Sequence, residues 1–463
     1  MRPTLSIPAR VRAAGAAFPG FAAFPGFTAS AGFAAFMACA ASTVFAQAGV
    51  DENALFADTA TVADSASRAA PAQAPAEIKT VGLSGTVLVF GRAGAQRGYF
   101  PDWDADHSDF ASGAIGDAAL DVRLQRGFRA YGDLEWDLDP NARGDSTVAF
   151  RIPETFLDAN LGRKVWLRAG KQVLQWGRGY FFNPTDLINV ERKSFFQRLG
   201  GREGTFGLKG QVPFGTRANL YAFLDTHAAT RADSLSGALK AEFLAGRTEF
   251  AFSAWDGGHR DPVYGADASS RLLGLNVTGE AALYQSFRAR ALVLDNGFPV
   301  LTDAQRDWQP RIALGAGRGF KVNGIQDRLN VVAEYYYNHP GSADRRMPFA
   351  DLLSQAAQAG ITPDQALALA GATGFYEPNS YSRHYAAVFL TFDRFLRSDM
   401  ALAFNAIGNL NQDAALLSGS LSYRDLNDFG LTLSVYGFAG PAGTEYTLSR
   451  QTVQLQLLAQ ASY

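Results

Sequence analysis

The chain ends in TVQLQLLAQASY, residues 452–463, and this stretch decides the fold. Every second residue from Val453 to Ala461 is apolar, whereas the residues between them are polar, with Leu458 as the one exception. Because successive side chains of a β-strand point to opposite faces, a period of two predicts a strand with one apolar and one polar face. Tyr463 completes the alternation. Such a strand suits a soluble sandwich or a membrane barrel, and the rest of the chain separates these two folds.

About 18 short runs with the same alternation follow one another from residue 78 to the C-terminus. In FRAYGDLEWDL, residues 128–138, one face carries Asp133, Glu135 and Asp137, and the other face is apolar. A charge that faces lipid at mid-bilayer costs about 2–4 kcal/mol, so three acids on one face require a wet interior. The run at 328–338 repeats this arrangement, with these residues expected to point inward: Asn330, Glu334, Tyr336 and Asn338.

Short and long connections alternate between these runs. The runs at 271–279 and 286–294 are predicted as strands, with long loops at 256–269 and 295–307. Short turns at one end and long loops at the other end are typical of outer-membrane barrels. The sequence therefore predicts an all-β fold, a transmembrane antiparallel β-barrel of about 18 strands (16–20) with long outer loops. An even number of strands puts both ends of the barrel on the periplasmic side.

The composition agrees with this prediction. Charged residues are 19% of the 463 residues, somewhat below the usual share. No uninterrupted apolar stretch of about 20 residues follows position 50, so no helical membrane span is predicted. The formal net charge is −2 and falls to −5 without the three arginines of the leader, so nucleic acid is not an expected partner.

Three segments are predicted along the chain. Residues 1–46 combine a positively charged start, an Ala/Phe/Gly-rich run and the small-residue stretch STVFAQA, which predicts a signal peptide cleaved after Ala46. FMAC, residues 36–39, is an alternative lipoprotein site. Residues 47–77 are rich in Ala, Asp, Ser and Pro and predict a flexible periplasmic linker. Residues 78–463 form the predicted outer-membrane barrel.

The third long loop, Trp176–Glu203, is the most distinctive segment. Its part from Arg178 to Arg202 contains five basic and two acidic residues, and Asn183-Pro184 is a turn signal. Four phenylalanines are expected to fix the loop to the wall: Phe181, Phe182, Phe195 and Phe196. The third outer loop of porins folds into the barrel, and the same is expected here. The residues assigned to this constriction are Arg178, Tyr180, Asn183, Asp186, Arg192, Lys193 and Arg198. The alternative is a surface loop with chance charges.

The wall that faces this loop is predicted to be charged. The residues assigned to it are Asp133, Glu135, Glu154, Asp158, Arg168 and Gln172. Opposed signs across a narrow lumen would create a transverse field that favours charged or dipolar solutes. Lys171 lies out of phase with this ladder, which indicates a register shift near Pro153 or in the neighbouring loop.

The stretch from Gly170 to Asn189, GKQVLQWGRGYFFNPTDLIN, resembles a known motif. The motif has the form Gly-[Arg/Lys]-Gln…Trp-Gly…Asn-Pro-x-Asp and occurs in largely uncharacterised porin-like and alginate-export-like outer-membrane barrels. The matching residues are Gly170, Lys171, Gln172, Trp176, Gly177, Asn183, Pro184, Asp186 and Asn189. The resemblance covers about 20 residues. It implies the barrel fold and an outer-membrane location, and it names no solute.

Other segments carry weaker signals. DWDADHSD, residues 102–109, alternates acids but lacks the glycine and the distal Glu of an EF-hand, so an acidic surface loop is predicted. The five histidines form no pair with metal-ligand spacing, so neither a metal nor a cofactor is expected. Ser382 and His384 lack the neighbours that a hydrolase needs, so an enzyme is not expected. Residues 347–374 have helical spacing and predict short helices in a long outer loop, as a lid or as a cap.

These features predict a passive outer-membrane channel for small polar or charged solutes. The alternative is a non-transport barrel that assembles or anchors surface polysaccharide. The expected partners are outer-membrane lipid, a small solute and the barrel-assembly machinery, which would recognise the strand that ends at Tyr463. Porins of this size are often trimers, which makes a homotrimer a further expectation, although no part of the sequence marks a trimer face.

Overall fold

The structure is a computed structural model, and the part that it describes belongs to one compact unit, Val44–Tyr463. The described residues are 80–96, 108–124, 127–140, 148–162, 164–188, 202–227, 229, 231, 234–257, 260–286, 291–295, 298–302, 307–347, 378–396, 399–424, 429–447 and 451–462. The predicted signal peptide and linker lie outside these residues. So do Tyr463, the second half of the third loop and residues 348–374 of the predicted helical loop.

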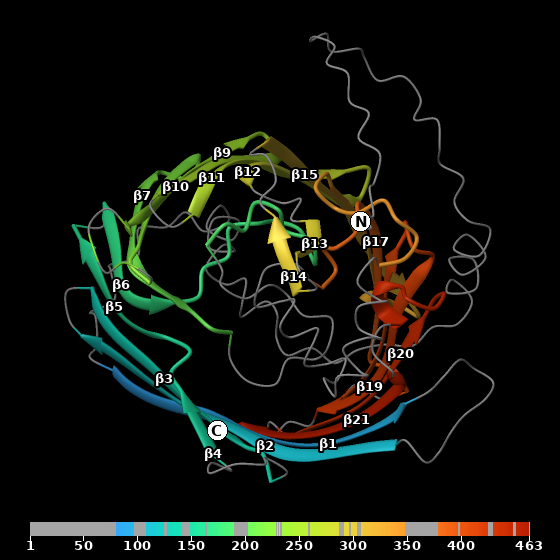
Figure 1. Ribbon diagram of the computed structural model, residues 1–463. Helices are drawn as coiled ribbons and strands as arrows, with labels where there is room; N and C mark the ends of the chain where they lie inside the picture. Colours follow the sequence, from blue (N-terminus) through green and yellow to red (C-terminus); the bar gives the residue numbers. More distant parts are fainter. Residues whose placement is uncertain are drawn as a thin grey trace. The chain divides into compact units, whose positions relative to one another are not determined.

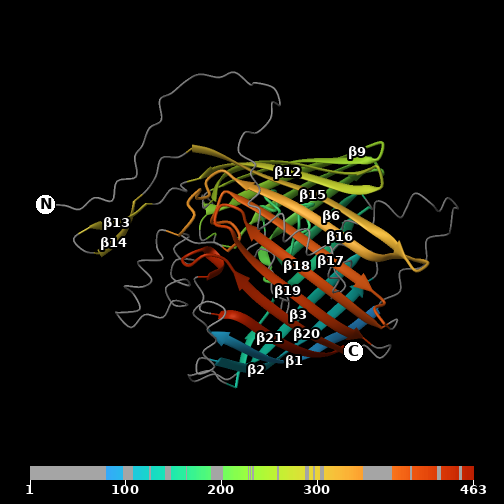
Figure 2. The same ribbon diagram turned by 90° about the vertical axis from the view of Figure 1, so that its right-hand side faces the viewer.

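The described strands form one antiparallel sheet that closes on itself (Figure 1). The first strand, β1 (Thr80–Gln96), pairs with the last strand, β21 (Gln451–Ser462), in a register that runs from Thr86 opposite Ser462 to Gln96 opposite Gln451. The strands cross the wall at a steep tilt (Figure 2), as closure of a barrel requires. A closed sheet of this kind leaves no long edge strand that could pair with another chain.

The other wall strands follow in chain order. They are β2 (Ser108–Leu124), β3 (Phe128–Leu138), β4 (Val148–Arg151), β5 (Thr155–Leu161), β6 (Val165–Gln172), β7 (Thr205–Phe214), β8 (Ala218–Asp225), β9 (Ser236–Ala245), β10 (Thr248–Gly257), β11 (Arg260–Leu272), β12 (Leu275–Ser286), β15 (Asp307–Val322), β16 (Ile325–Asn338), β17 (His384–Asp393), β18 (Met400–Asn409), β19 (Ala414–Arg424) and β20 (Phe429–Ala439). Both β4 and β5 pair with β3 and share one place in the wall, so the barrel has 18 strands, as predicted.

The terminal strand has the two faces that its sequence predicts. Leu455 and Leu457 are 44% and 52% exposed on the outside, whereas Gln454, Gln456 and Leu458 are buried on the inside. The same division holds around the barrel. Exposed outer residues include Val89, Phe252, Leu314 and Leu433. An apolar exterior on a closed barrel needs lipid around it, and the wall therefore has the character of a membrane-spanning barrel.

Two strands differ from the prediction. Residues 260–272 and 275–286 form β11 and β12, so the predicted long loop at 256–269 and the predicted strands at 271–279 and 286–294 are wrong. Residues 291–302 instead contain a separate hairpin of β13 (Ala291–Asp295) and β14 (Phe298–Thr302), which pair only with each other. The number of strands stays the same because the two errors compensate.

The cause of this error is the turn between β11 and β12. Leu273 and Gly274 have φ angles of 53° and 79°, nearly the same as the 49° and 81° of Asn323 and Gly324 between β15 and β16. Positive φ at both central residues defines the type I′ hairpin turn, in which Asn-Gly is the favoured pair. Leucine is rare in this conformation, so the sequence around Leu273 gives no turn signal.

The pairing of the wall with β3 is irregular between β4 and β5. Glu135 lies opposite Arg151 and Gly132 lies opposite Thr155, so three steps along β3 match four steps along the partner. The extra residue forms a β-bulge. This bulge includes Pro153, which has no N–H to donate. The pairing with β3 is thus irregular near Pro153, whereas the register between β5 and β6 runs without a shift through Lys171.

Helices contribute little to the described residues. The described part of the chain includes a short 3₁₀ helix, η4 (Glu445–Thr447). Among the described residues, none of the helices is long and apolar enough to cross a membrane. The predicted short helices of 347–374 fall almost wholly outside the described residues and stay a prediction.

Replacement of Leu273 with Asn should stabilise the barrel. A left-handed conformation costs a residue with a Cβ roughly 1–2 kcal/mol, and asparagine reduces this cost through local hydrogen bonds. We expect the free energy of unfolding to rise by about 1 kcal/mol in a urea titration of the protein in lipid vesicles. The matched control is Asn323→Leu, which should lower it by a similar amount. Equal urea midpoints for the two variants and the unchanged protein would contradict the assigned turn.

Candidate functional site

The chain enters the barrel interior directly after β6. Residues 173–188, here called the inner segment, run inside the ring of strands (Figure 1). They form hydrogen bonds with side chains on β9, β10, β11, β12 and β16. These side chains lie on the face opposite the exposed outer residues Leu239, Phe252 and Leu314 of the same wall. The inner segment therefore lies against the inside of the barrel wall.

Two buried carboxylates hold the backbone of the inner segment. Glu334 of β16 accepts hydrogen bonds from the N–H groups of Tyr180, Phe181 (2.8 Å) and Phe182 (3.0 Å). Glu280 of β12 accepts from the N–H groups of Arg178 and Gly179, and from both the N–H (3.1 Å) and the hydroxyl (2.7 Å) of Thr185. Backbone amides that converge on a carboxylate form an anion-binding nest, so the charge of each acid is matched by the loop itself.

Arg178 binds a second group of acids on three neighbouring strands. Its guanidinium donates to Asp267 of β11, to Glu249 of β10 and to Glu242 of β9, the last at 3.5 Å. Lys240 adds a second cation, 3.1 Å from Glu242 and 3.6 Å from Asp267. Burial alone would lower the pKa of Arg178, but Asp267, Glu242 and Glu249 outweigh this effect and raise the pKa above its ordinary value. The arginine therefore stays charged as a clamp and is not a free pore cation.

The motif residues fold the inner segment onto itself. The N–H of Trp176 donates to the Asp186 carboxylate at 3.2 Å, and the N–H of Asp186 donates to the Asn183 carbonyl at 3.2 Å. A Cβ on Gly177 would lie only 2.7 Å from Asn183, so a side chain at 177 does not fit. The Trp-Gly…Asn-Pro-x-Asp spacing thus closes a compact loop. Tyr284 of β12 completes it by donating to the Pro184 carbonyl at 2.6 Å.

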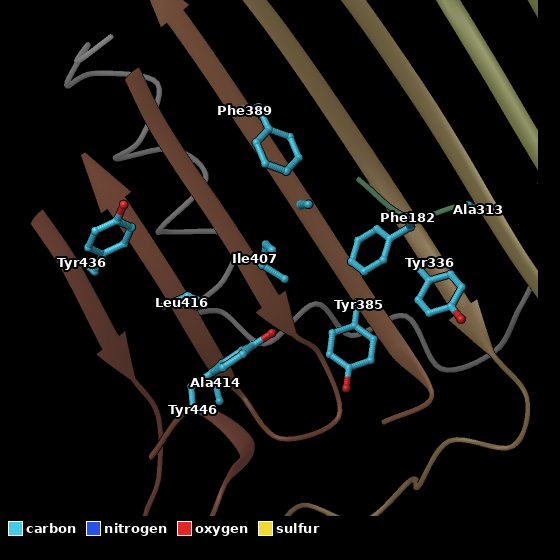
Figure 3. Packing of buried hydrophobic residues seen from close by; sticks show 11 residues of the cluster. Phe182, Ala313, Tyr336, Tyr385, Phe389, Ile407, Ala414, Leu416, Tyr436 and Tyr446 are labelled. Carbon is cyan, nitrogen blue, oxygen red and sulfur yellow. The ribbon is translucent and has the colours of Figure 1, made fainter. Parts of the chain in front are cut away.

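Aromatic rings anchor the other side of the inner segment (Figure 3). Phe182 stacks on Tyr336 with ring centroids 4.8 Å apart and an interplanar angle of 11°. Tyr180 and Phe181 lie 4.6 Å and 5.8 Å from the ring of Phe389. The buried cluster that receives Phe182 is Ala313, Tyr336, Tyr385, Ala387, Phe389, Ile407, Ala414, Leu416, Tyr436 and Tyr446. The expected packing of Phe181 and Phe182 against the wall is present.

The predicted wall residues lie on the neighbouring strands β3, β5 and β6, with Glu154 directly before β5. Asp158 is paired with Arg168 (2.7 Å and 3.1 Å) and lies 3.7 Å from Arg129, so charges alternate across neighbouring strands. Glu135 is paired with Arg151. Glu154 accepts from the N–H of Val173 at 2.6 Å, and Gln172 donates to the Gly207 carbonyl at 3.3 Å. The backbone N–H of Asp133 donates to the Glu154 carbonyl at 2.9 Å.

Arg178 contacts a different set of acids from the set that was predicted to face the third loop. It contacts Glu242, Glu249 and Asp267, not Asp133 or Asp158. Three other predicted constriction residues, Arg192, Lys193 and Arg198, lie outside the described residues, as do Asn189, Phe195 and Phe196.

Two of the acids that hold the inner segment, Asp267 and Glu280, were missed for the same reason. Asp267 falls in the predicted loop at 256–269, and Glu280 falls between the two misplaced strands. Correct placement of the turn at Leu273 would have put both acids on the inner face, since they lie directly opposite each other in the β11–β12 register. Glu334, whose strand was predicted correctly, was assigned to the interior.

The position of Lys171 shows why it lies out of phase with the charged residues of the inner wall. It points to the outside of the wall, where its ammonium binds Glu203 and donates to the Ile152 carbonyl at 2.7 Å. Within the described part of the chain, no group of three or more His, Cys, Asp or Glu side chains is arranged to hold a metal ion.

Known structures share this architecture. No family model and no curated protein sequence matches the chain. OccK2 (OpdF) of Pseudomonas aeruginosa, solved in complex with glucuronate, is 9% identical over 82% of this chain and 97% of that chain, with a TM-score of 0.50. OpdL of Pseudomonas aeruginosa is 9% identical over 83% of this chain and 98% of that chain, also with a TM-score of 0.50. Both neighbours are Occ/OprD-family outer-membrane porins.

The fold is that of an outer-membrane porin. At 9% identity the likeness concerns the porin fold alone. The closed barrel and its apolar exterior agree with this fold and with a location in the outer membrane.

Arg178→Met should destabilise the barrel strongly. The substitution leaves Glu242, Glu249 and Asp267 without their shared cation, and loss of one partner of a buried ion pair costs about 3–5 kcal/mol. The control is Arg123→Met. Arg123 also binds an acid, Asp121, but its side chain is 63% exposed, so we expect a loss below about 1 kcal/mol. Urea unfolding, monitored by tryptophan fluorescence, measures the free energy of unfolding of both variants. Similar losses of stability in the two variants would contradict a clamp at Arg178.

Proposed function

We propose that the protein is a passive outer-membrane channel for small polar or charged solutes and that the inner segment narrows its lumen. One observation carries this proposal: Glu280 and Glu334, both on the inside of the wall, bind the backbone of residues 178–185. A loop held by buried carboxylates on two separated strands has a fixed position inside the barrel. A fixed loop restricts the passage in a defined way, as a selective channel requires.

The polar inner wall supports the passage of water and solutes. Asp121, Arg129, Asp158 and Arg168 form a chain of ion pairs across β2, β3, β5 and β6. Ion pairs that remain partly exposed on an inner wall are stable in a wet lumen and costly in a dry one. The uptake or export of charged solutes agrees with such a wall.

The solute to test first is suggested by a neighbour of the same fold. OccK2 was solved with glucuronate, an acidic sugar, which makes glucuronate a suitable first solute. A sealed barrel that anchors or assembles surface polysaccharide is the competing function.

Planar-bilayer recording tests the channel. The purified protein should give discrete conductance steps, and Glu280→Ala/Glu334→Ala should give larger and less regular steps, because the inner segment loses its two carboxylates. Asp121→Asn separates loss of a lumenal charge from release of the inner segment, since Asp121 binds Arg123 and Arg129 and no residue of the inner segment in the described structure. Correctly folded protein without any conductance would rule out the channel and favour the sealed barrel. Unchanged conductance steps in the double variant would show that the inner segment does not narrow the passage.

We also propose that the barrel-assembly machinery recognises the last strand. The alternation of Val453 to Ala461 and the aromatic Tyr463 resemble the C-terminal signal of outer-membrane proteins. Tyr463→Ser should therefore lower the amount of assembled protein in outer-membrane fractions far more than it lowers the stability of the refolded barrel. Trp308→Ser, at an exposed outer aromatic residue far from the terminus, is the control. Normal surface levels of the Tyr463 variant would contradict recognition of the last residue.

A further inference from the structure

The short turns at one end of the barrel carry exposed basic side chains. These turns lie at the end where the closing strand β21 finishes (Figure 2), and in outer-membrane barrels that end faces the periplasm. Five successive turns, from β5–β6 to β15–β16, contain or adjoin exposed cations, here called the basic arc: Lys164, Arg217, Arg247, Arg271, Arg318 and Lys321. The connections after β2, β17 and β19 continue the pattern with Arg123, Arg394 and Arg424, which are also exposed.

The exposed charge at this end has one predominant sign. Among the described residues of the five turns and of the strand ends beside them, Asp327 is the one exposed acid. At the opposite end, exposed charges of both signs occur in the described part of the chain, and they include Asp139, Asp256, Asp307, Asp344, Arg231, Arg345 and Arg346. The whole chain has a formal net charge of −2, so the basic arc is not the result of a basic composition.

Arg318 shows that the basic arc reaches the outside of the wall. It belongs to the outward phase of β15, together with the exposed residues Leu314 and Phe320. Its guanidinium lies 5.2 Å from the ring centroid of Phe320, and a Cβ on Gly274 of the neighbouring β11–β12 turn would lie 3.8 Å from its Cζ atom. An arginine on a lipid-facing wall lays its stem on apolar surface and keeps its charged head at the membrane boundary. A solute in the lumen is on the other side of the wall, so the anion that Arg318 meets lies outside the barrel.

Exposed apolar side chains accompany these cations. Leu272 and Leu275 pair across the β11–β12 hairpin and are both exposed, next to the place where the guanidinium of Arg318 reaches the turn. Phe214 is 59% exposed at the end of β7, three residues before Arg217. Apolar residues on the outside of a wall with cations at its rim match the boundary between the acyl chains and the headgroups of a membrane.

We propose that the basic arc binds anionic phospholipid headgroups of the periplasmic leaflet. Guanidinium and ammonium groups bind phosphate through charge-assisted hydrogen bonds. A single Lys or Arg near an anionic membrane surface strengthens the association about fivefold, and the cations of one arc act on the same lipids within a Debye length of about 10 Å. This proposal rests on the location in the outer membrane and does not depend on conduction.

The geometry favours lipid over other anionic partners at this end of the barrel. Cell-wall polymer or an acidic periplasmic protein would meet the tips of the turns, which lie farthest from the bilayer. Arg318 and Phe214 instead lie on strands, on the side of the wall that lipid covers. A partner that contacts both the cations and these outward apolar residues has a charged head and an apolar body, as a phospholipid does.

Electron paramagnetic resonance of spin-labelled lipids tests this binding. The full chain is reconstituted in phosphatidylcholine vesicles that contain a trace of spin-labelled phosphatidylglycerol or spin-labelled phosphatidylcholine. We expect the anionic label to associate with the barrel about threefold more strongly or better, and 1 M salt to abolish most of this preference, since the Debye length then falls to about 3 Å. Equal association of the two labels at low salt would overturn the proposal.

Variants assign the preference to the basic arc. Arg247→Gln/Arg271→Gln/Arg318→Gln should lower the preference for the anionic label by about half or more, because three of the six cations of the arc are lost. The corresponding triple replacement with lysine should retain most of it, since the positive charge stays at each position. Heat-modifiable migration in gels checks that each variant is folded. An unchanged preference in the folded glutamine variant would overturn the assignment.

The matched control removes three exposed arginines from the other end of the barrel. Arg231→Gln/Arg345→Gln/Arg346→Gln changes the net charge by the same amount as the first glutamine variant. It should leave the preference for phosphatidylglycerol as it is, because these residues lie in the long loops. An equal loss of preference in the two glutamine variants would show an effect of net charge alone and would overturn the proposal.

Co-sedimentation with purified peptidoglycan tests the competing partner. We expect little retention of the unchanged protein on peptidoglycan. Strong retention that is lost in Arg247→Gln/Arg271→Gln/Arg318→Gln, together with equal association of the two lipid labels, would overturn the lipid proposal and assign the arc to the cell wall. The outcome is separable from the bilayer recording, since a barrel that conducts no ions and still prefers phosphatidylglycerol would refute the channel and support the basic arc.

Discussion

The interaction on which the interior depends is the hydrogen bonding of buried carboxylates to backbone amides. Glu280 and Glu334 are buried side chains of the wall, 2% and 5% exposed. Their charge is balanced by the N–H groups of residues 178–182 and 185. An unpaired carboxylate at such a depth would be very costly, so wall and inner segment are stable only together. The barrel and its contents thus form one cooperative unit.

The interior is consequently divided into two unlike sides. On β15 to β20 the inner segment covers an aromatic and aliphatic cluster that would be poorly hydrated if it faced water. On β2 to β6 the wall keeps a chain of partly exposed ion pairs centred on Asp121, Arg129, Asp158 and Arg168. The guanidinium of Arg168 also lies over the ring of Phe156, 3.8 Å from its centroid, which adds a cation–π contact to the ion pair. The space for water is therefore expected along the charged side.

Much of the wall follows from the sequence because a period of two is a direct consequence of strand geometry. The residues of 452–462 and 328–338 alternate clearly, and their faces were predicted correctly. Prediction failed where a turn lacked its usual residues: Leu273 occupies a conformation that asparagine or glycine normally adopts, and the error moved Asp267 and Glu280 out of the strands. Arg178 was singled out by its loop, but its partners were not, because pairing across the lumen depends on the order of strands around the barrel.

The bulge between β4 and β5 has a consequence for the evolution of the third loop. Glu154, inside the bulge, accepts from the N–H of Val173 at the start of the loop, and the carbonyl of Pro153 accepts from the N–H of Gly204 at its end. A Cβ on Gly204 would lie 2.8 Å from that carbonyl, so the exit is as tightly fixed as the entry. Both ends of the loop are therefore fastened to one point of the wall, about one strand spacing apart. Insertions or deletions between residues 188 and 202 can change the length and chemistry of the loop while the register of β6 and β7 stays the same, so this barrel can acquire new solute preferences by exchanging a single closed segment.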